Sequence, residues 1–468
     1  MILTNLTVSE LLEALSSRKL SAVELAKAVI DKVHETNNLG AIAAFNPEAY
    51  LLAAEASDQR RTKGNVGNLE GIPLVLKDNI DTNTLPTTGG TGALSGKTPS
   101  KDAPAVTLLC QEGAIIAAKA VMHELAFGIT SNNSVTGPAR NPYDPSMIPG
   151  GSSGGTAASV GARQFPAGLG TDTGGSVRIP SALCGLIGFR PSVGRYPGEG
   201  VIPISTTRDT IGPIARSIAD IMLLDEVLAK HATTENKLPG LNSLRIGIPR
   251  TRFWENLEPG VEKLANEAIQ LLAAEGVIFV EEDFSDIWEL NDNTGFPVAL
   301  FEVMRELPSY LKKAGYDISI DELLAGVESP DVKGILSSQI GDEAMPEAAY
   351  LAAIETHRPK MQQIYKDYFE NNQLDAIIFP TTPLTARPIG QDETVEHNGK
   401  QEPTFPIFIR NTDLGSNIGA PGISLPMGLT NGLPAGIELE GEPGSDKRLL
   451  DIASACEPVL TPVLPPAV

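Results

Sequence analysis

The sequence predicts an α/β protein in which helices cover both faces of one sheet. Three observations favour this class. Short continuous apolar runs alternate with amphipathic helical patterns, no linker-like stretch interrupts the chain before residue 458, and the 468 residues are 41% hydrophobic. Apolar runs of about four to eight residues are typical of strands that are buried on both faces. A chain of this length and composition can bury a large core, so the composition excludes a disordered protein.

The first 60 residues are expected to form helices. Two helices should begin after Thr7 and Ser21, because each is followed three residues later by glutamate, as in a capping box. A third helix is expected from residues 46–47 through 56. Beyond it, the apolar run at residues 72–76 predicts a buried strand that ends at Lys77.

The rest of the chain continues this alternation. Further strands are expected at residues 114–117, 244–248, 277–280, 376–379, 423–425 and 435–439, and helices at 102–113, 215–230, 260–275 and 446–456, the first of them capped by Asp102. Residues 285–370 are expected to be mostly helical, and 461–468 form a Pro-rich tail. Residues 127–213 are rich in Gly, Ser, Thr and Asn, so we expect a long functional loop region there.

Charge and cysteine content exclude several functional classes. The net charge of −22 would repel a phosphate backbone, so no nucleic-acid partner is expected. Three scattered cysteines form no disulfide framework, and neither they nor the five histidines have metal-ligand spacing, so no metal is expected. No segment resembles a signal peptide or a stretch of about 18 apolar residues, which favours a cytoplasmic protein without membrane contact.

Two glycine-serine clusters, at residues 150–155 and 170–178, are the strongest candidates for chemistry. Successive backbone N–H groups of Thr173, Gly174, Gly175 and Ser176 could form a nest that binds an oxyanion. The alternative for both clusters is a pair of tight turns in which serines serve as caps. Composition alone does not choose between these two interpretations.

Two familiar motifs match poorly. Residues 151–155 fit the nucleophile-elbow pattern GxSxG centred on Ser153, but the Pro-containing segment before it is not a predicted strand. Residues 90–98 approach a phosphate-binding loop, but Thr91 stands where that motif needs glycine. Neither motif is expected to function.

The second cluster, GTDTGGSVRIPS, together with GGSSGG, resembles the amidase signature family. Similar blocks occur at residues 74–79, 209–213, 375–381 and 421–426, so the resemblance extends over residues 5–460. It implies a single domain with a mixed central sheet. The block at residues 122–133 is most similar to the indoleacetamide and mandelamide hydrolases of that family.

The resemblance also implies roles for individual residues. Ser176 would be the nucleophile, and Ser152, on a cis peptide bond, would bridge it to Lys77. A lysine can act as a base only when it is neutral, which requires burial that lowers its pKa. The oxyanion and substrate would be bound at Thr173, Gly174 and Gly175 and, nearby, at Thr171, Gly128 and Ser131.

The activity implied is hydrolysis of a small neutral amide, such as an arylacetamide, through an acyl-serine intermediate and without a cofactor. Alternatives are the glutaminase subunit of a tRNA-dependent amidotransferase, an aryl acylamidase or carbamate hydrolase, and a non-catalytic binding module. A homodimer is compatible with the sequence. Five phenylalanines are candidates for an apolar acyl pocket, although core packing is the more common role for each one alone: Phe296, Phe301, Phe379, Phe405 and Phe408.

Three other residues near the motifs are expected to be structural. Asp172 and Arg178 are expected to pair and brace the loop between them. His123 is expected to be a hydrogen-bonded structural histidine, and Cys184 a small core residue.

Overall fold

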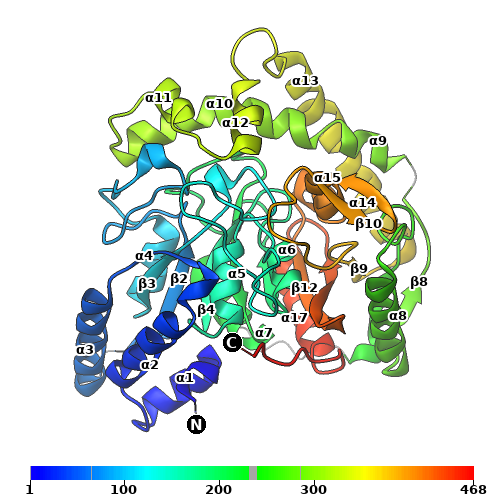
Figure 1. Ribbon diagram of the computed structural model, residues 1–468. Helices are drawn as coiled ribbons and strands as arrows, with labels where there is room; N and C mark the ends of the chain where they lie inside the picture. Colours follow the sequence, from blue (N-terminus) through cyan, green and yellow to red (C-terminus); the bar gives the residue numbers. More distant parts are fainter. Residues whose placement is uncertain (1, 65, 231–239, 285, 468) are drawn as a thin grey trace.

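A mixed eleven-stranded sheet organises the molecule, as the predicted fold class requires (Figure 1). The computed structural model describes residues 2–64, 66–230, 240–284 and 286–467. In spatial order the strands are β1 (Ile42–Phe45), β3 (Ile115–Ala120), β2 (Pro73–Lys77), β4 (Ala167–Asp172), β6 (Thr210–Ala215), β5 (Ile187–Arg190), β12 (Gly422–Thr430), β13 (Leu433–Glu440), β9 (Ala376–Pro380), β7 (Arg245–Gly247) and β8 (Ile278–Val280).

Parallel and antiparallel pairs divide the sheet. Strand β2 runs parallel to both β3 and β4, and β7 runs parallel to β8 and β9. The strands between these groups pair in antiparallel fashion, from β4–β6 through β13–β9. Every residue of β2 is buried, as its continuous apolar sequence predicts.

The N-terminal helices α1 (Val8–Ser16), α2 (Ala22–Glu35) and α3 (Pro47–Lys63) form where the sequence predicts them. Both capping boxes, at Thr7 and Ser21, are present. The predicted cap of α4 (Pro104–Gln111) is wrong. Ala103 occupies the N-cap position, and Asp102 accepts a hydrogen bond of 2.7 Å from the backbone N–H of Asn83 instead.

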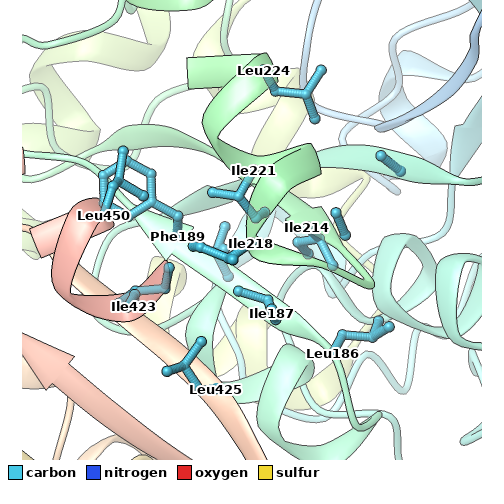
Figure 2. Close-up of a cluster of buried hydrophobic side chains, with 14 of the residues drawn as sticks. Leu186, Ile187, Phe189, Ile214, Ile218, Ile221, Leu224, Ile423, Leu425 and Leu450 are labelled. Carbon is cyan, nitrogen blue, oxygen red and sulfur yellow. The ribbon is translucent and has the colours of Figure 1, made fainter. Parts of the chain in front are cut away.

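Helices α7 (Ile218–Ala229) and α17 (Asp446–Cys456) pack together against the middle of the sheet. Figure 2 shows the apolar side chains of α7 above those of β5 and β6, among them Ile218, Ile221, Phe189 and Ile214. Residues 215–217 were expected to be helical. The helix begins only at residue 218, because β6 extends to Ala215 and Ser217 caps the helix.

Residues 127–213 are not a long loop. They contain β4, β5, β6 and two short helices, α5 (Gly154–Gly161) and α6 (Arg178–Leu183), all of them buried. Their glycines allow close approach between backbones. A Cβ at Gly155 would lie 2.3 Å from the carbonyl oxygen of Val121, and one at Gly168 would lie 2.6 Å from that of Val75. The Gly-rich composition therefore reflects close packing of elements and not irregular structure.

A helical layer covers one end of the sheet, at the top of Figure 1. It includes α9 (Ile287–Asp292), α10 (Gly295–Ala314), α11 (Ile320–Ala325), α12 (Pro330–Ser337) and α13 (Glu347–Ala352), followed by α14 (Arg358–Asn372). Helices α10, α11 and α12 share an apolar cluster with Met122, Leu125 and Phe127.

The remaining elements come from two segments of the chain. Helix α8 (Pro259–Ala274) connects β7 to β8 along the chain. The hairpin formed by β10 (Thr394–His397) and β11 (Lys400–Pro403) is followed by α15 (Thr404–Ile409) and α16 (Asp413–Ile418). Residues 461–467 contain neither helix nor strand. Within the described ranges, no helix is long and apolar enough to cross a membrane.

Candidate active site

Lys77 lies at the end of β2 and is fully buried. Its amine nitrogen Nζ lies 2.7 Å from the hydroxyl oxygen of Ser152 and 2.7 Å from that of Thr171. The carbonyl oxygen of Thr171 is 3.5 Å away. Strand β4 brings Thr171 to this position because it runs parallel to β2 and pairs Leu169 with Leu76.

Burial lowers the pKa of Lys77 to about 7, against the opposing charges of Asp172 and Asp209. Within the part of the chain that the structure describes, no carboxylate forms an ion pair with this amine. A neutral amine has two N–H donors and one lone pair. All three contacts lie at distances at which the charged amine donates, and the neutral amine could instead turn its lone pair to the Ser152 hydroxyl.

Ser152 belongs to the turn that precedes α5. The Gly151–Ser152 peptide bond is cis, as the resemblance implied. The carbonyl oxygen of Ser152 accepts a hydrogen bond of 3.1 Å from the N–H of His123, and the Ser131 hydroxyl accepts one of 3.0 Å from the N–H of Gly154. These two bonds fix the turn on both sides of Ser152.

Ser176 lies half-buried in the loop between β4 and α6. Across the described residues, the backbone N–H groups of Thr173, Gly174, Gly175 and Ser176 make no hydrogen bond, so they are free to bind an oxyanion. Gly175 has φ 144°, and a Cβ there would lie 2.2 Å from the Thr412 hydroxyl oxygen, so only glycine fits.

Side chains from three elements hold this loop. The Thr412 hydroxyl donates a hydrogen bond of 2.6 Å to the carbonyl oxygen of Gly174. The Thr173 hydroxyl donates one of 2.6 Å to Asp209, and Asp172 accepts one of 3.1 Å from the N–H of Val177. The loop is therefore a preorganised donor cluster.

Ser176 opens into a cavity whose walls are mainly apolar. Arg208 and Asp413, the charged residues in its lining, form an ion pair of 2.6 Å with each other. The cavity thus brings together the Ser176 hydroxyl, backbone N–H groups without a hydrogen-bond partner among the described residues, and an apolar wall. Its lining includes Phe127, Gly128, Ile129, Thr173, Gly174, Ile204, Phe296, Leu300, Ile335, Phe405 and Ile409.

Comparison with known proteins identifies the family. A family model described as Amidase matches residues 24–450. An indoleacetamide hydrolase from Rhizobium radiobacter is 44% identical over 453 residues, which cover 96% of each chain. A mandelamide hydrolase from Pseudomonas putida is 41% identical over 478 residues, covering 98% of this chain and 92% of that one. A crystal structure of an amidase superposes with a TM-score of 0.86 at 31% identity, over 97% of this chain and all of that one.

The chain belongs to the amidase family. The predicted resemblance to amidase signature enzymes is confirmed, and this chain is a hydrolytic amidase. In the described parts of this amidase, no group of three His, Cys, Asp or Glu side chains could hold a metal ion.

The amidase brings most of the predicted site residues together, but not all of them. Gly128 lines the cavity, where a Cβ would collide with the ring of His123 at 2.1 Å. Ser131 was expected to bind substrate, but it is fully buried beneath the turn of Ser152 and does not line the cavity. Ser153 is also fully buried and no strand precedes it, so the nucleophile-elbow alternative is excluded.

Only two of the five predicted pocket phenylalanines, Phe296 and Phe405, line the cavity. Phe379 stacks on Phe253 in the core with ring centroids 4.1 Å apart, and Phe408 is fully buried. Phe301 stacks on Tyr350 with centroids 4.3 Å apart. These three point into the packing between elements, which their sequence positions alone did not reveal.

The structural roles predicted for neighbouring residues are correct. Asp172 and Arg178 form a buried ion pair of 3.1 Å. His123 is buried and its Nε2 lies 2.9 Å from Asp331. Cys184 is a buried core residue.

Phe127, Arg208 and Asp413 also line the cavity, although they were not among the residues predicted from the sequence. Phe127 lies inside the block quoted for the resemblance, so its position in that block was a usable signal. Nothing in the sequence indicates that Arg208 and Asp413, which are 205 positions apart, would pair.

Proposed function

We propose that this amidase hydrolyses small neutral primary amides with an apolar, arylacetyl-like acyl group, using Ser176 as nucleophile and Lys77 as base. One observation carries the proposal. A buried lysine without a carboxylate partner lies 2.7 Å from Ser152, beside a cavity that Ser176 and mainly apolar side chains line.

The reaction begins when the Ser176 oxygen attacks the amide carbon. Its proton passes to Ser152, whose own proton passes to the neutral amine of Lys77. The negative oxygen of the tetrahedral intermediate is stabilised by the free N–H groups of residues 173–176, where one such donor contributes on the order of 10²–10³ in rate.

The leaving amine takes the proton back from Lys77 through Ser152, so the carbon–nitrogen bond breaks and ammonia leaves. Water then attacks the acyl carbon and gives a proton through Ser152 to Lys77. The bond between the acyl carbon and the Ser176 oxygen breaks, and that oxygen takes the proton back through Ser152. The products are ammonia and a carboxylic acid, and the enzyme returns to its starting protonation state.

The acyl specificity follows from the cavity. Phe127, Phe296 and Phe405 come from three separate segments, and the rings of Phe296 and Phe405 lie 5.8 Å apart between centroids. Arg208 and Asp413 satisfy each other, so the cavity has no uncompensated charge for an ionic substrate. The names of the two enzymes compared above, indoleacetamide and mandelamide hydrolase, also favour an aryl substrate.

The test compares kcat/KM for indoleacetamide, mandelamide and phenylacetamide with that for malonamate, glutamine and an anilide at matched ionic strength. The neutral arylacetamides should be hydrolysed fastest. Preference for glutamine would favour the amidotransferase-subunit alternative, and preference for an anilide or carbamate would reject the primary-amide assignment.

The nucleophile is tested separately. A fluorophosphonate followed by peptide mapping should label Ser176. Labelling of another serine would reject the proposed mechanism whatever the substrate.

A further inference from the structure

A cluster of five ionisable side chains lies fully buried directly behind the Ser176 loop. Its members are Asp172 on β4, Arg178 on α6, Arg190 on β5, and Glu438 and Glu440 on β13. Two positive charges face three carboxyl groups. If all three were ionised, the cluster would carry an uncompensated negative charge in the protein interior, which is strongly unfavourable.

The arginines hold the first two carboxylates tightly. Arg178 donates to Asp172 at 3.1 Å through both Nε and Nη2, and Arg190 donates to it at 2.8 Å. These cations hold the pKa of Asp172 well below its usual range, although burial opposes them. Arg178 Nη1 also donates to Glu438 at 2.6 Å, a short charge-assisted bond.

Glu440 has weaker partners. Its Oε2 lies 3.8 Å from Arg178 Nη1, beyond hydrogen-bond distance, and its Oε1 accepts a hydrogen bond of 2.9 Å from the neutral hydroxyl of Tyr365 on α14. Both Glu438 Oε2 and Glu440 Oε2 are buried without a hydrogen-bond partner. Glu442, which follows the end of β13, is a further charged group that acts on Tyr365.

We propose that the Glu438–Glu440 pair carries one proton, held at Glu440, and that the neutral cluster this creates fixes the position of the Ser176 loop. A proton there balances the two arginines against two remaining carboxylates. It also removes a negative charge from the oxygen that lacks a partner. Burial raises the pKa of both glutamic acids, and the negative charge of Glu438 raises that of Glu440 further.

Two connections link the cluster to the loop. Asp172, which both arginines orient, accepts the N–H of Val177, the residue after Ser176. Arg178 also donates a hydrogen bond of 3.0 Å to the carbonyl oxygen of Thr412, whose hydroxyl holds Gly174. Glu438 and Glu440 are thus positioning residues. This positioning role rests on the proposed function of Ser176, whereas the shared proton does not.

The proton is detected by infrared spectroscopy of the full-length protein with ¹³C-labelled glutamate at pH 7. Wild type should show the C=O stretch of a protonated glutamic acid. Glu440→Gln should lose it, and Glu438→Gln should lose it too, because Glu440 must then ionise to balance Arg178. The matched control is Glu70→Gln, at another buried glutamate that pairs with Arg60 at 2.8 Å, and it should keep the band.

Absence of the band in wild type, or its persistence in either cluster variant, would overturn the shared proton. These outcomes do not depend on activity, so they remain decisive even if the proposed substrate is wrong.

Activity tests the positioning role. Glu440→Gln should keep kcat within about three-fold of wild type, because an amide mimics the neutral acid. The double variant Glu438→Gln/Glu440→Gln leaves Arg178 partly uncompensated. Its kcat should fall below the product of the single effects by on the order of ten-fold. Strictly multiplicative effects, or loss of kcat in Glu440→Gln, would overturn the role.

A pH series gives a second readout. A carboxyl group with a raised pKa stabilises the fold fully at low pH and loses that contribution as pH rises through the folded-state pKa. Glu440→Gln removes this loss, so its stability relative to wild type should rise mainly between the ordinary glutamate pKa of 4.5 and the raised value of about 8. A constant difference between the two proteins would contradict a proton at Glu440, and it decides the matter even if the double variant does not fold.

Discussion

Two fully buried lysines, Lys77 and Lys119, lie at neighbouring positions on adjacent parallel strands. The register pairs Leu76 of β2 with Lys119 of β3, and both lysine side chains are 0% exposed. They share side-chain chemistry and burial, although the register places them on opposite faces of the sheet. They differ in what surrounds the amine.

Lys119 is surrounded by groups that stabilise a cation. Its amine donates to the carbonyl oxygens of Ile80 at 2.6 Å and Pro86 at 3.2 Å, and to the Thr87 hydroxyl at 2.7 Å. The carboxylate of Asp78 lies 3.5 Å away. Lys77 has two hydroxyls and no carboxylate at ion-pair distance.

Burial lowers the pKa of both lysines, but Asp78 opposes the shift at Lys119. Under the proposed mechanism, burial alone does not make a lysine a base, because Lys119 is equally buried but has a carboxylate beside its amine. A buried lysine becomes neutral near physiological pH when its neighbours are hydroxyls and its counter-charges are distant.

Replacing Lys77 with methionine should mainly lower activity, whereas replacing Lys119 should mainly lower stability. The largest effect is expected at Lys77. Lys77→Met should lower kcat by on the order of 10³-fold or more, because the base is lost. The fold should change little, since methionine replaces a neutral side chain of similar length without leaving a charge unpaired. Steady-state kinetics and the melting temperature measure the two effects. A kcat near that of wild type would reject Lys77 as the base.

Lys119→Met should instead destabilise the protein by about 3–5 kcal/mol, because Asp78 is left buried without its cation. Chemical denaturation gives the free energy of unfolding. The double variant Lys119→Met/Asp78→Asn should recover part of the loss, since the amide removes the unpaired charge. If the double variant were no more stable than the single one, the ion pair would not be the cause.

The position of Lys77 was predictable from the sequence, because a continuous apolar run ends at that residue. The fold class and the N-terminal helices were predictable for the same reason, since periodicity and capping are local signals. Strands such as β4, with the sequence AGLGTD, were not. Glycine and aspartate are depleted in strands, so the sequence of this segment does not predict one, and its pairing with β2 and β6 accounts for its extended form.

Contacts between residues that are distant along the chain could not be predicted from the sequence either. The pairing of Arg178 with Glu438 joins positions 260 residues apart across the sheet. Alternation along β13 places Glu438 and Glu440 on one face, but it does not reveal that this face is buried and meets Arg178.

The pH dependence of kcat/KM should distinguish the two lysines. Only the neutral amine of Lys77 accepts a proton, so kcat/KM should rise about ten-fold per pH unit on the acid side and level off above a pKa of about 7. Lys119 should contribute no limb in this range because it does not take part in the reaction. The profile is measured with one neutral amide substrate, so that substrate ionisation does not contribute. A rate independent of pH between 5 and 8 would reject a neutral lysine as the base.

The smallest effects are expected from replacing two matched threonines, each of which accepts a hydrogen bond from one of the two lysines. Thr171→Val removes a hydroxyl that accepts from Lys77, so the charged amine loses an acceptor and the acid limb should move to lower pH. A net hydrogen bond of about 0.5–1.5 kcal/mol makes this shift roughly one pH unit or less. Thr87→Val removes the corresponding acceptor of Lys119, so it should lower the free energy of unfolding by a similar amount and leave the limb unchanged. Equal shifts of the acid limb in both variants would mean that the two lysines are not functionally distinct.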